Sequence, residues 1–373
     1  MEVKNLNFSR QDHTTLYFVF LAEQLPYYGL SSLELARRYS GARVCLIGPE
    51  GMGRAVRKAG IDFIALEDFY SPIEAQDVAA RAGMSTSFRD GFWVKTLERF
   101  FVLEQFMRHA NLTEVLHAEL DQLLFRVDLL DRALRLLPET GIFVPFHRPD
   151  AAVASVFFCN NRMALSSLLD YARKSASISN EMALLADWAH DVPQFAWALP
   201  TLATVLRPAQ AALPVVGPSP AQLGGIVDAA QLGQWVAGIE PRNVPLYRRH
   251  RTKFVDAPHE MLLTEHQLRS VNLSFNEGDG ELRCVLGSGE GLRLYNLHIH
   301  SKIHSQLVQR RRSMGGMIAL SNQPVRHRVP GTIQLRARYL LTDLLIPVAR
   351  HPRHAASVIW RRSLSCLRNG RTK

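Results

Sequence analysis

The alternation of apolar and polar segments in the first 66 residues predicts a β-α-β-α-β unit. Apolar runs at residues 15–22, 42–48 and 62–66 have the composition of buried strands, and helical patterns fill residues 31–39 and 51–59 between them. A serine at its start is expected to cap the first helix. Strands joined by such helices run parallel with right-handed crossovers, so the pattern predicts an α/β fold.

The same alternation continues through the middle of the chain. In residues 92–110 apolar side chains recur at three- and four-residue intervals, which indicates a helix packed on the sheet. The short apolar run at 115–118 predicts a strand buried on both faces. Further elements are expected as strands at 141–145 and 151–158, helices at 162–174 and 180–190, a helical segment at 225–236 and a strand pair within 270–286.

The predicted strand at 115–118 runs directly into two acidic residues, Glu119 and Asp121. In open α/β sheets ligands bind outside the carboxyl ends of the strands, so this pair is expected where a divalent cation and its phosphates would be held. A Glu-x-Asp sequence is also common in a strand-ending turn with solvated acids. Other segments of the chain are needed to distinguish a cation site from a solvated turn.

A second candidate segment lies far along the chain, at residues 294–302. If it is extended, His298, His300 and Lys302 share one face, so an imidazole can join the acid pair and the lysine can neutralise a diphosphate. Sites for Mg²⁺ or Mn²⁺ take carboxylate and sometimes imidazole ligands. A His-x-His sequence is also common as a structural or surface feature. A hydrolytic zinc site is not indicated, because the sequence has no His-Glu-x-x-His motif.

The composition is that of an ordinary globular protein. The chain has 373 residues, of which 47% are apolar and 21% charged. Its four cysteines show no paired spacing, and its first residues lack the apolar core of a signal peptide, so we expect a cytoplasmic protein with reduced thiols. The most apolar long stretch, residues 195–206, is too short to span a membrane.

The net charge of +10 belongs to the end of the chain. Residues 306–373 hold 14 Lys and Arg against one acid, Asp343, a net charge of +13 that leaves −3 for residues 1–305. We therefore expect a globular domain over 1–305 and a basic extension over 306–373. Such a tail is typical of contact with anionic lipid or of a soluble appendage, and it lacks the interleaved aromatic residues of nucleic-acid binding.

Several catalytic classes lose support because their motifs are missing. The sequence has no Gly-x-Ser-x-Gly elbow, no Walker loop and no Gly-x-Gly-x-x-Gly after the first strand. A sugar-phosphate nucleotidyltransferase needs a glycine-rich loop there to cradle a nucleoside triphosphate, and residues 22–26 read Ala-Glu-Gln-Leu-Pro. That class remains the alternative enzyme, and a non-catalytic protein that binds a nucleotide sugar or a membrane surface remains a third hypothesis.

Four segments together resemble bacterial GT-A-fold glycosyltransferases. Residues 92–107 and 115–125 look like the helix and the Asp-x-Asp-type strand of that family, and 227–243 and 296–302 resemble two later motifs of sugar transferases from surface-polysaccharide pathways. The resemblance implies a GT-A-like, Rossmann-type α/β fold, with a mixed, mostly parallel sheet flanked by helices. It also implies a hexosyltransferase that moves a sugar from a nucleotide-sugar donor to a glycan or lipid-linked acceptor in cell-surface polysaccharide assembly.

The resemblance further implies a donor diphosphate held on Mn²⁺ or Mg²⁺. Asp121 matches the metal-binding aspartate, while Glu119, in place of the first aspartate, is either a ligand or a contact of the donor. The C-terminal metal ligand falls on His298 or His300 and the diphosphate-binding lysine on Lys302, although the usual His-x-x-Gly-x-x-Lys spacing is absent.

The same resemblance suggests the remaining site residues. Arg99 lies where related enzymes place a donor-binding arginine, and Lys95 is one turn away on the same predicted helix. Asp228 and Gln234 lie on the later helical pattern as candidate catalytic residues. Asp228 would orient the donor sugar or act as base on the acceptor hydroxyl, with a helix N-terminal carboxylate as the alternative.

Overall fold

The computed structural model describes residues 14–89, 91–208, 212–237, 263, 267–268, 270–286 and 291–299. The chain divides into two compact units, Met1–Asn322 and Gln323–Lys373, and every described residue belongs to the first. The expected boundary between residues 305 and 306 lies outside the described residues and stays a prediction.

Eight strands form the central sheet: β1 (Thr15–Val19), β2 (Arg43–Gly48), β3 (Asp62–Ala65), β4 (Val115–Ala118), β6 (Ile142–Arg148), β7 (Ala151–Ala152), β8 (Val156–Cys159) and β9 (Ala196–Leu199). Their order is β3-β2-β1-β4-β8-β6-β7, and β9 pairs with β6. The pairings from β3 to β4 and between β6 and β9 are parallel, whereas β8 is antiparallel to β4 and β6. The predicted α/β class with a mixed, mostly parallel sheet is confirmed.

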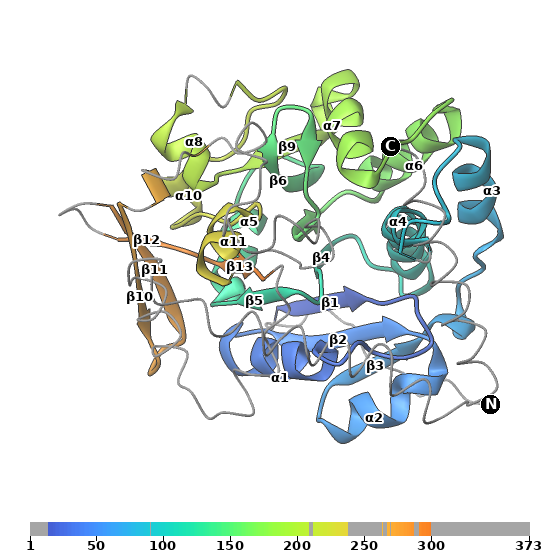
Figure 1. The fold of residues 1–373 in the computed structure, drawn as a ribbon, viewed down its shortest axis with the longest axis horizontal. Helices are drawn as coiled ribbons and strands as arrows, with labels where there is room; N and C mark the ends of the chain where they lie inside the picture. The colour runs from blue at the N-terminus through green and yellow to red at the C-terminus, as the bar shows by residue number, and fades with distance from the viewer. Residues whose placement is uncertain are drawn as a thin grey trace, which may run out of the picture. The chain divides into compact units, whose positions relative to one another are not determined.

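Helices cover both faces of this sheet: α1 (Gly29–Tyr39), α2 (Gly53–Lys58), α3 (Ile73–Arg81), α4 (Phe92–His109), α5 (Val127–Arg135), α6 (Arg162–Lys174) and α7 (Glu181–Asp191). Side chains of α3, α4, α6 and α7 pack with the sheet in one apolar core, and those of α1, α2 and α5 pack in a second. Figure 1 shows α1 and α2 on one side of β1–β3 and α4, α6 and α7 on the other. The sheet is therefore the middle of three layers.

Two smaller sheets accompany the central sheet in the described part of the chain. An antiparallel sheet is formed by β10 (Val271–Asn276), β11 (Glu281–Leu286) and β12 (Leu292–Arg293), and a two-stranded sheet by β5 (Gln122–Leu124) and β13 (Asn296–His298). Three short helices, α8 (Leu202–Leu206), α10 (Pro220–Leu223) and α11 (Gln231–Ala237), lie between β9 and β10 in the sequence. Side chains of α1, α8, α11 and both small sheets form a third apolar core.

Some local expectations are wrong. The first helix begins at Gly29 and not at residue 31, because the amide of Ser32 already donates to the carbonyl of Tyr28 (2.9 Å); Tyr28 precedes it without a side-chain cap. The strand expected over 151–158 is divided into β7 and β8 by a turn. The helix expected over 225–236 begins only at Gln231, so Asp228 precedes it.

No helix in the described part of the chain is both long and apolar enough to cross a bilayer.

Candidate functional site

The acid pair occupies a tight turn at the carboxyl end of β4. All four residues of β4 are buried, as expected for a strand covered on both faces. The amide of Glu119 donates to the carbonyl of Ser155 (3.2 Å), and the amide of Gln122 donates to the carbonyl of Glu119 (3.3 Å). These bonds turn the chain from β4 into β5 and leave the Glu119 and Asp121 side chains partly exposed at the sheet edge.

The strand β13 brings an imidazole to this turn. It pairs antiparallel with β5, with His298 opposite Gln122, and the two strands lie side by side in Figure 1. The amide of Ile299 donates to the carbonyl of Asp121 (2.7 Å). As a result, His298 Nε2 lies 3.1 Å from Asp121 Oδ2 and 3.7 Å from Glu119 Oε2.

These three side chains could hold a metal ion. Ligand atoms of Glu119, Asp121 and His298 all lie within 4.8 Å of one another. Two carboxylates and one imidazole form a donor set that suits Mn²⁺ and Mg²⁺, with coordination positions left for ligand oxygens. The partly exposed carboxylates leave the cluster accessible from the sheet edge.

Arg99 approaches the same cluster from α4. Its guanidinium is buried, with Nη1 2.6 Å from Glu119 Oε1. Its Nε and Nη2 atoms are also buried and make no hydrogen bond with any residue that the structure describes. Because a buried guanidinium normally satisfies its donors, these two nitrogens indicate that an acceptor from water or a ligand belongs beside them.

Glu181, the first residue of α7, is a site residue that the sequence reasoning missed. Its buried carboxylate accepts a hydrogen bond from Thr96 Oγ1 (2.8 Å) on α4. Burial raises the pKa of Glu181 to about 7, against the opposing effect of the Arg99 charge. Acidic residues are common in the first turn of a helix, so nothing in the sequence indicates that this side chain turns inward.

A neutral histidine lies beneath the acid pair, in β4. His117 is fully buried, and its Nδ1 atom is 3.0 Å from the carbonyl oxygen of Tyr17. Burial lowers the pKa of His117 well below its usual value, and the charge of Arg99 lowers it further. The imidazole is therefore neutral, and the carbonyl requires a proton on Nδ1.

Asp228 lies close to the cluster, but both of its carboxylate oxygens accept hydrogen bonds from backbone amides. Its Oδ1 accepts from the amide of Leu232 (3.0 Å), and its Oδ2 accepts from the amides of Gly233 (2.7 Å) and His298 (3.1 Å). Burial raises the pKa of Asp228, while these bonds lower it. The general-base role of Asp228 stays a prediction. These hydrogen bonds disfavour it, because both carboxylate oxygens already accept from backbone amides.

Of the other expected site residues, two are described by the structure and two are not. Gln234 is partly buried on α11, and Lys95 is exposed on α4 one turn before Arg99. Their assigned roles stay predictions. His300 and Lys302 lie outside the described residues, so the choice between the two histidines and the contact of the lysine with a diphosphate also stay predictions.

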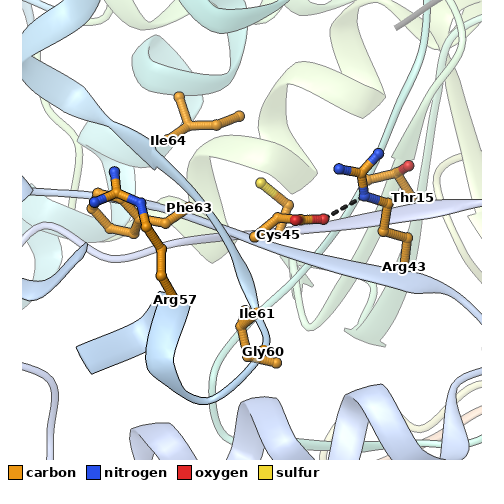
Figure 2. A pocket seen from close by; sticks show the side chains of 9 residues that line it. Thr15, Arg43, Cys45, Arg57, Gly60, Ile61, Phe63 and Ile64 are labelled. Atoms are coloured by element: carbon orange, nitrogen blue, oxygen red, sulfur yellow. Dashed lines mark hydrogen bonds and ion pairs between the residues drawn. The ribbon is translucent and has the colours of Figure 1, made fainter. Parts of the chain in front are cut away.

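A cavity of about 390 Å³ lies elsewhere on the molecule, at the opposite edge of the sheet. It is lined by the first residues of β1, β2 and β3, which are Thr15, Arg43 and Asp62, and by Arg57 and Phe63 (Figure 2). Arg43 is paired with Asp62 there, and Arg57 lies over the ring of Phe63. Because β1–β4 run parallel, this amino-terminal edge is separate from the cluster at the carboxyl end of β4.

Comparison with solved structures finds similar folds among sugar and nucleotide transferases. They include mouse xyloside xylosyltransferase 1 (TM-score 0.34, 10% identity, covering 52% of this chain and 90% of that one). Galactosyltransferase LgtC in complex with donor and acceptor sugar analogues matches with TM-score 0.31 and 12% identity, over 67% of this chain and 83% of that one. A cytidylyltransferase from Leptospira borgpetersenii matches with TM-score 0.32 and 10% identity, over 54% and 79%.

No protein-family model and no curated protein matches the chain. Because their TM-scores and identities are low, the similar structures carry no assignment of activity to this chain. Such an assignment has to rest on the geometry of the site.

Proposed function

We propose that the protein is a metal-dependent glycosyltransferase that uses a nucleotide-sugar donor. The observation that carries the proposal is the meeting of Glu119, Asp121 and His298, from segments about 180 residues apart, at the carboxyl edge of an α/β sheet. Ligands of open α/β sheets bind at this edge. A diphosphate is a ligand whose oxygens would complete the coordination of such a cation.

The transfer reaction places negative charge on the departing diphosphate. A bound Mn²⁺ or Mg²⁺ ion would stabilise that charge as a Lewis acid. Asp121 and His298 would hold the ion, and Glu119 would either join them or keep Arg99 in place through their 2.6 Å contact. Stabilisation that is stronger in the transition state than in the ground state is what accelerates bond cleavage.

Arg99 is the described residue best placed to bind the donor. Its contact with Glu119 engages Nη1, and leaves Nε and Nη2 as two buried donors that bond to no residue that the structure describes. They would bind a hydroxyl or phosphate oxygen of the donor, with more effect than in water because the surroundings are buried. Lys95 and Lys302 are proposed as additional positive charges near the diphosphate.

The finer assignment rests on the motif resemblance. We propose a hexose as the transferred sugar and a glycan or lipid-linked molecule as the acceptor, in bacterial surface-polysaccharide assembly on the cytoplasmic side.

A donor panel tests this function. The purified protein is incubated with Mn²⁺ or Mg²⁺ and a series of nucleotide sugars, and release of the nucleoside diphosphate is measured by ion-exchange chromatography. At least one donor should be hydrolysed or used, and Asp121→Ala should abolish that turnover and weaken donor binding. Unchanged turnover in Asp121→Ala would show the site to be wrong. Pyrophosphate release from a nucleoside triphosphate and a sugar phosphate would favour a nucleotidyltransferase instead.

A further inference from the structure

The backbone around His298 is held by an unusually dense set of contacts, which we call the His298 clamp: Asp228, Gly233 and Asn296. The amide of His298 donates to Asp228 Oδ2 (3.1 Å). Two residues earlier, the side chain of Asn296 bonds to both backbone groups of Asp228, with Oδ1 accepting from its amide (2.8 Å) and Nδ2 donating to its carbonyl (3.0 Å). All of these side chains are buried.

Gly233 completes the clamp by its lack of a side chain. Its amide donates to the same Oδ2 atom of Asp228 (2.7 Å) that receives the His298 amide. A Cβ atom on Gly233 would overlap the carbonyl group of His298 and lie 2.7 Å from its amide nitrogen. These are backbone atoms, so the overlap can be relieved only by moving the strand or the helix. The N-terminal turn of α11 therefore rests directly on the residue that supplies the imidazole.

We propose that Asp228 and Gly233 are positioning residues that set the place of the His298 imidazole, and through it the affinity of the site for a divalent cation. This inference rests on the proposed metal site. Hydrogen-bonded groups behind metal ligands change affinity 10- to 100-fold when they are mutated. Of the three proposed ligands, His298 alone comes from the distant segment, and its position relative to Asp121 depends on how β13 pairs with β5.

Two substitutions separate the clamp from general stability. Gly233→Ala adds one methyl group in a helix, where alanine is normally favoured over glycine, so a weaker site would arise from the overlap with His298. Asp228→Asn keeps the shape of the side chain but presents an amide donor to backbone amides that also donate. Gly278→Ala, on the β10–β11 turn, and Asp131→Asn, at a buried carboxylate on α5, are the matched controls.

The measurement is Mn²⁺ binding, counted as the loss of the free-ion signal in electron paramagnetic resonance, with circular dichroism to check folding. Both clamp variants should bind Mn²⁺ 10- to 100-fold more weakly than the wild-type protein, and both controls should bind within about twofold of it. His298→Ala should also weaken binding. Adding Gly233→Ala to His298→Ala should cause little further loss, because both changes act through the same imidazole.

The outcomes distinguish the clamp from the metal site itself. If His298→Ala and Asp121→Asn weaken Mn²⁺ binding while the folded clamp variants bind as the wild type does, the positioning role is overturned and the proposed function stands. A full additional loss in the double variant would also overturn it. If the wild type binds no Mn²⁺, or binds it equally well without Asp121 and His298, both proposals fail. Should Gly233→Ala not fold, Asp228→Asn carries the same test.

Discussion

At the scale of single residues, the site is defined by charges that the fold has taken out of water. Arg99 pairs with the partly exposed Glu119, and its charge opposes the effect of burial on the pKa of the buried Glu181 carboxyl. Removing a charge from such a group leaves its partners uncompensated, which usually costs more than the original pairing contributed. Conservative substitutions are therefore the informative ones here.

Glu181 should make the stability of the protein depend on pH. Its pKa is about 7 in the folded protein and about 4.5 in the unfolded chain, so the folded state retains the proton to a higher pH. Relative to Glu181→Gln, the wild-type protein should lose up to about 3 kcal/mol of unfolding free energy as the pH rises from about 4.5 to 7. Urea unfolding at several pH values measures the difference. A pH-independent difference would contradict the assignment, and Glu23→Gln, at an exposed carboxylate, is the control.

Arg99→Lys should weaken donor binding without unfolding the protein. Lysine keeps the charge beside Glu119 but lacks the planar fork whose Nε and Nη2 atoms we assign to the donor. We expect the Kd for the nucleotide sugar, measured by calorimetry with the donor found active, to rise about 10- to 100-fold, the equivalent of one or two hydrogen bonds to a charged group. The control is Lys95→Gln, at an exposed position on the same helix, with a smaller expected effect. Equal Kd values for Arg99→Lys and the wild type would exclude Arg99 from the donor site.

At the scale of elements, the decisive feature is the pairing of β13 with β5. The sequence indicated the α/β class, the strand before Glu119 and the long helix α4, because each has a clear apolar pattern. It did not indicate β5 or its pairing, since three residues after a turn carry no periodic signal and the partner lies about 170 residues away. The position of Asp228 before α11 was missed because the apolar pattern begins earlier than the helix.

Asn296 should stabilise this pairing more than its size suggests. Its buried side chain bonds to Gln122 Oε1 (2.8 Å) and to both backbone groups of Asp228. Asn296→Ala leaves these groups unsatisfied, so we expect a loss of about 2–4 kcal/mol in the free energy of unfolding, measured with urea. Asn276→Ala, at the exposed end of β10, should cost less than about 1 kcal/mol. Similar losses for the two variants would contradict the buried network.

At the scale of the whole molecule, charge separates the expected globular domain from the basic extension. Residues 306–373 carry a net charge of +13 and residues 1–305 carry −3. If the extension contacts anionic lipid, the full chain should sediment with vesicles containing phosphatidylglycerol at low salt and dissociate as salt is raised. Removal of residues 306–373 should abolish sedimentation. Unchanged sedimentation after the deletion would exclude this role.

The central claim is that the acid pair and a distant imidazole meet on one cation that bridges a diphosphate. Crystals soaked with Mn²⁺ and nucleoside diphosphates test it most directly, through the anomalous scattering of manganese. We predict a manganese peak within bonding distance of Asp121 and His298, with diphosphate oxygens in its coordination shell and Arg99 beside the ligand. A diphosphate and manganese bound together elsewhere on the molecule, with Asp121 and His298 contacting neither, would contradict the account.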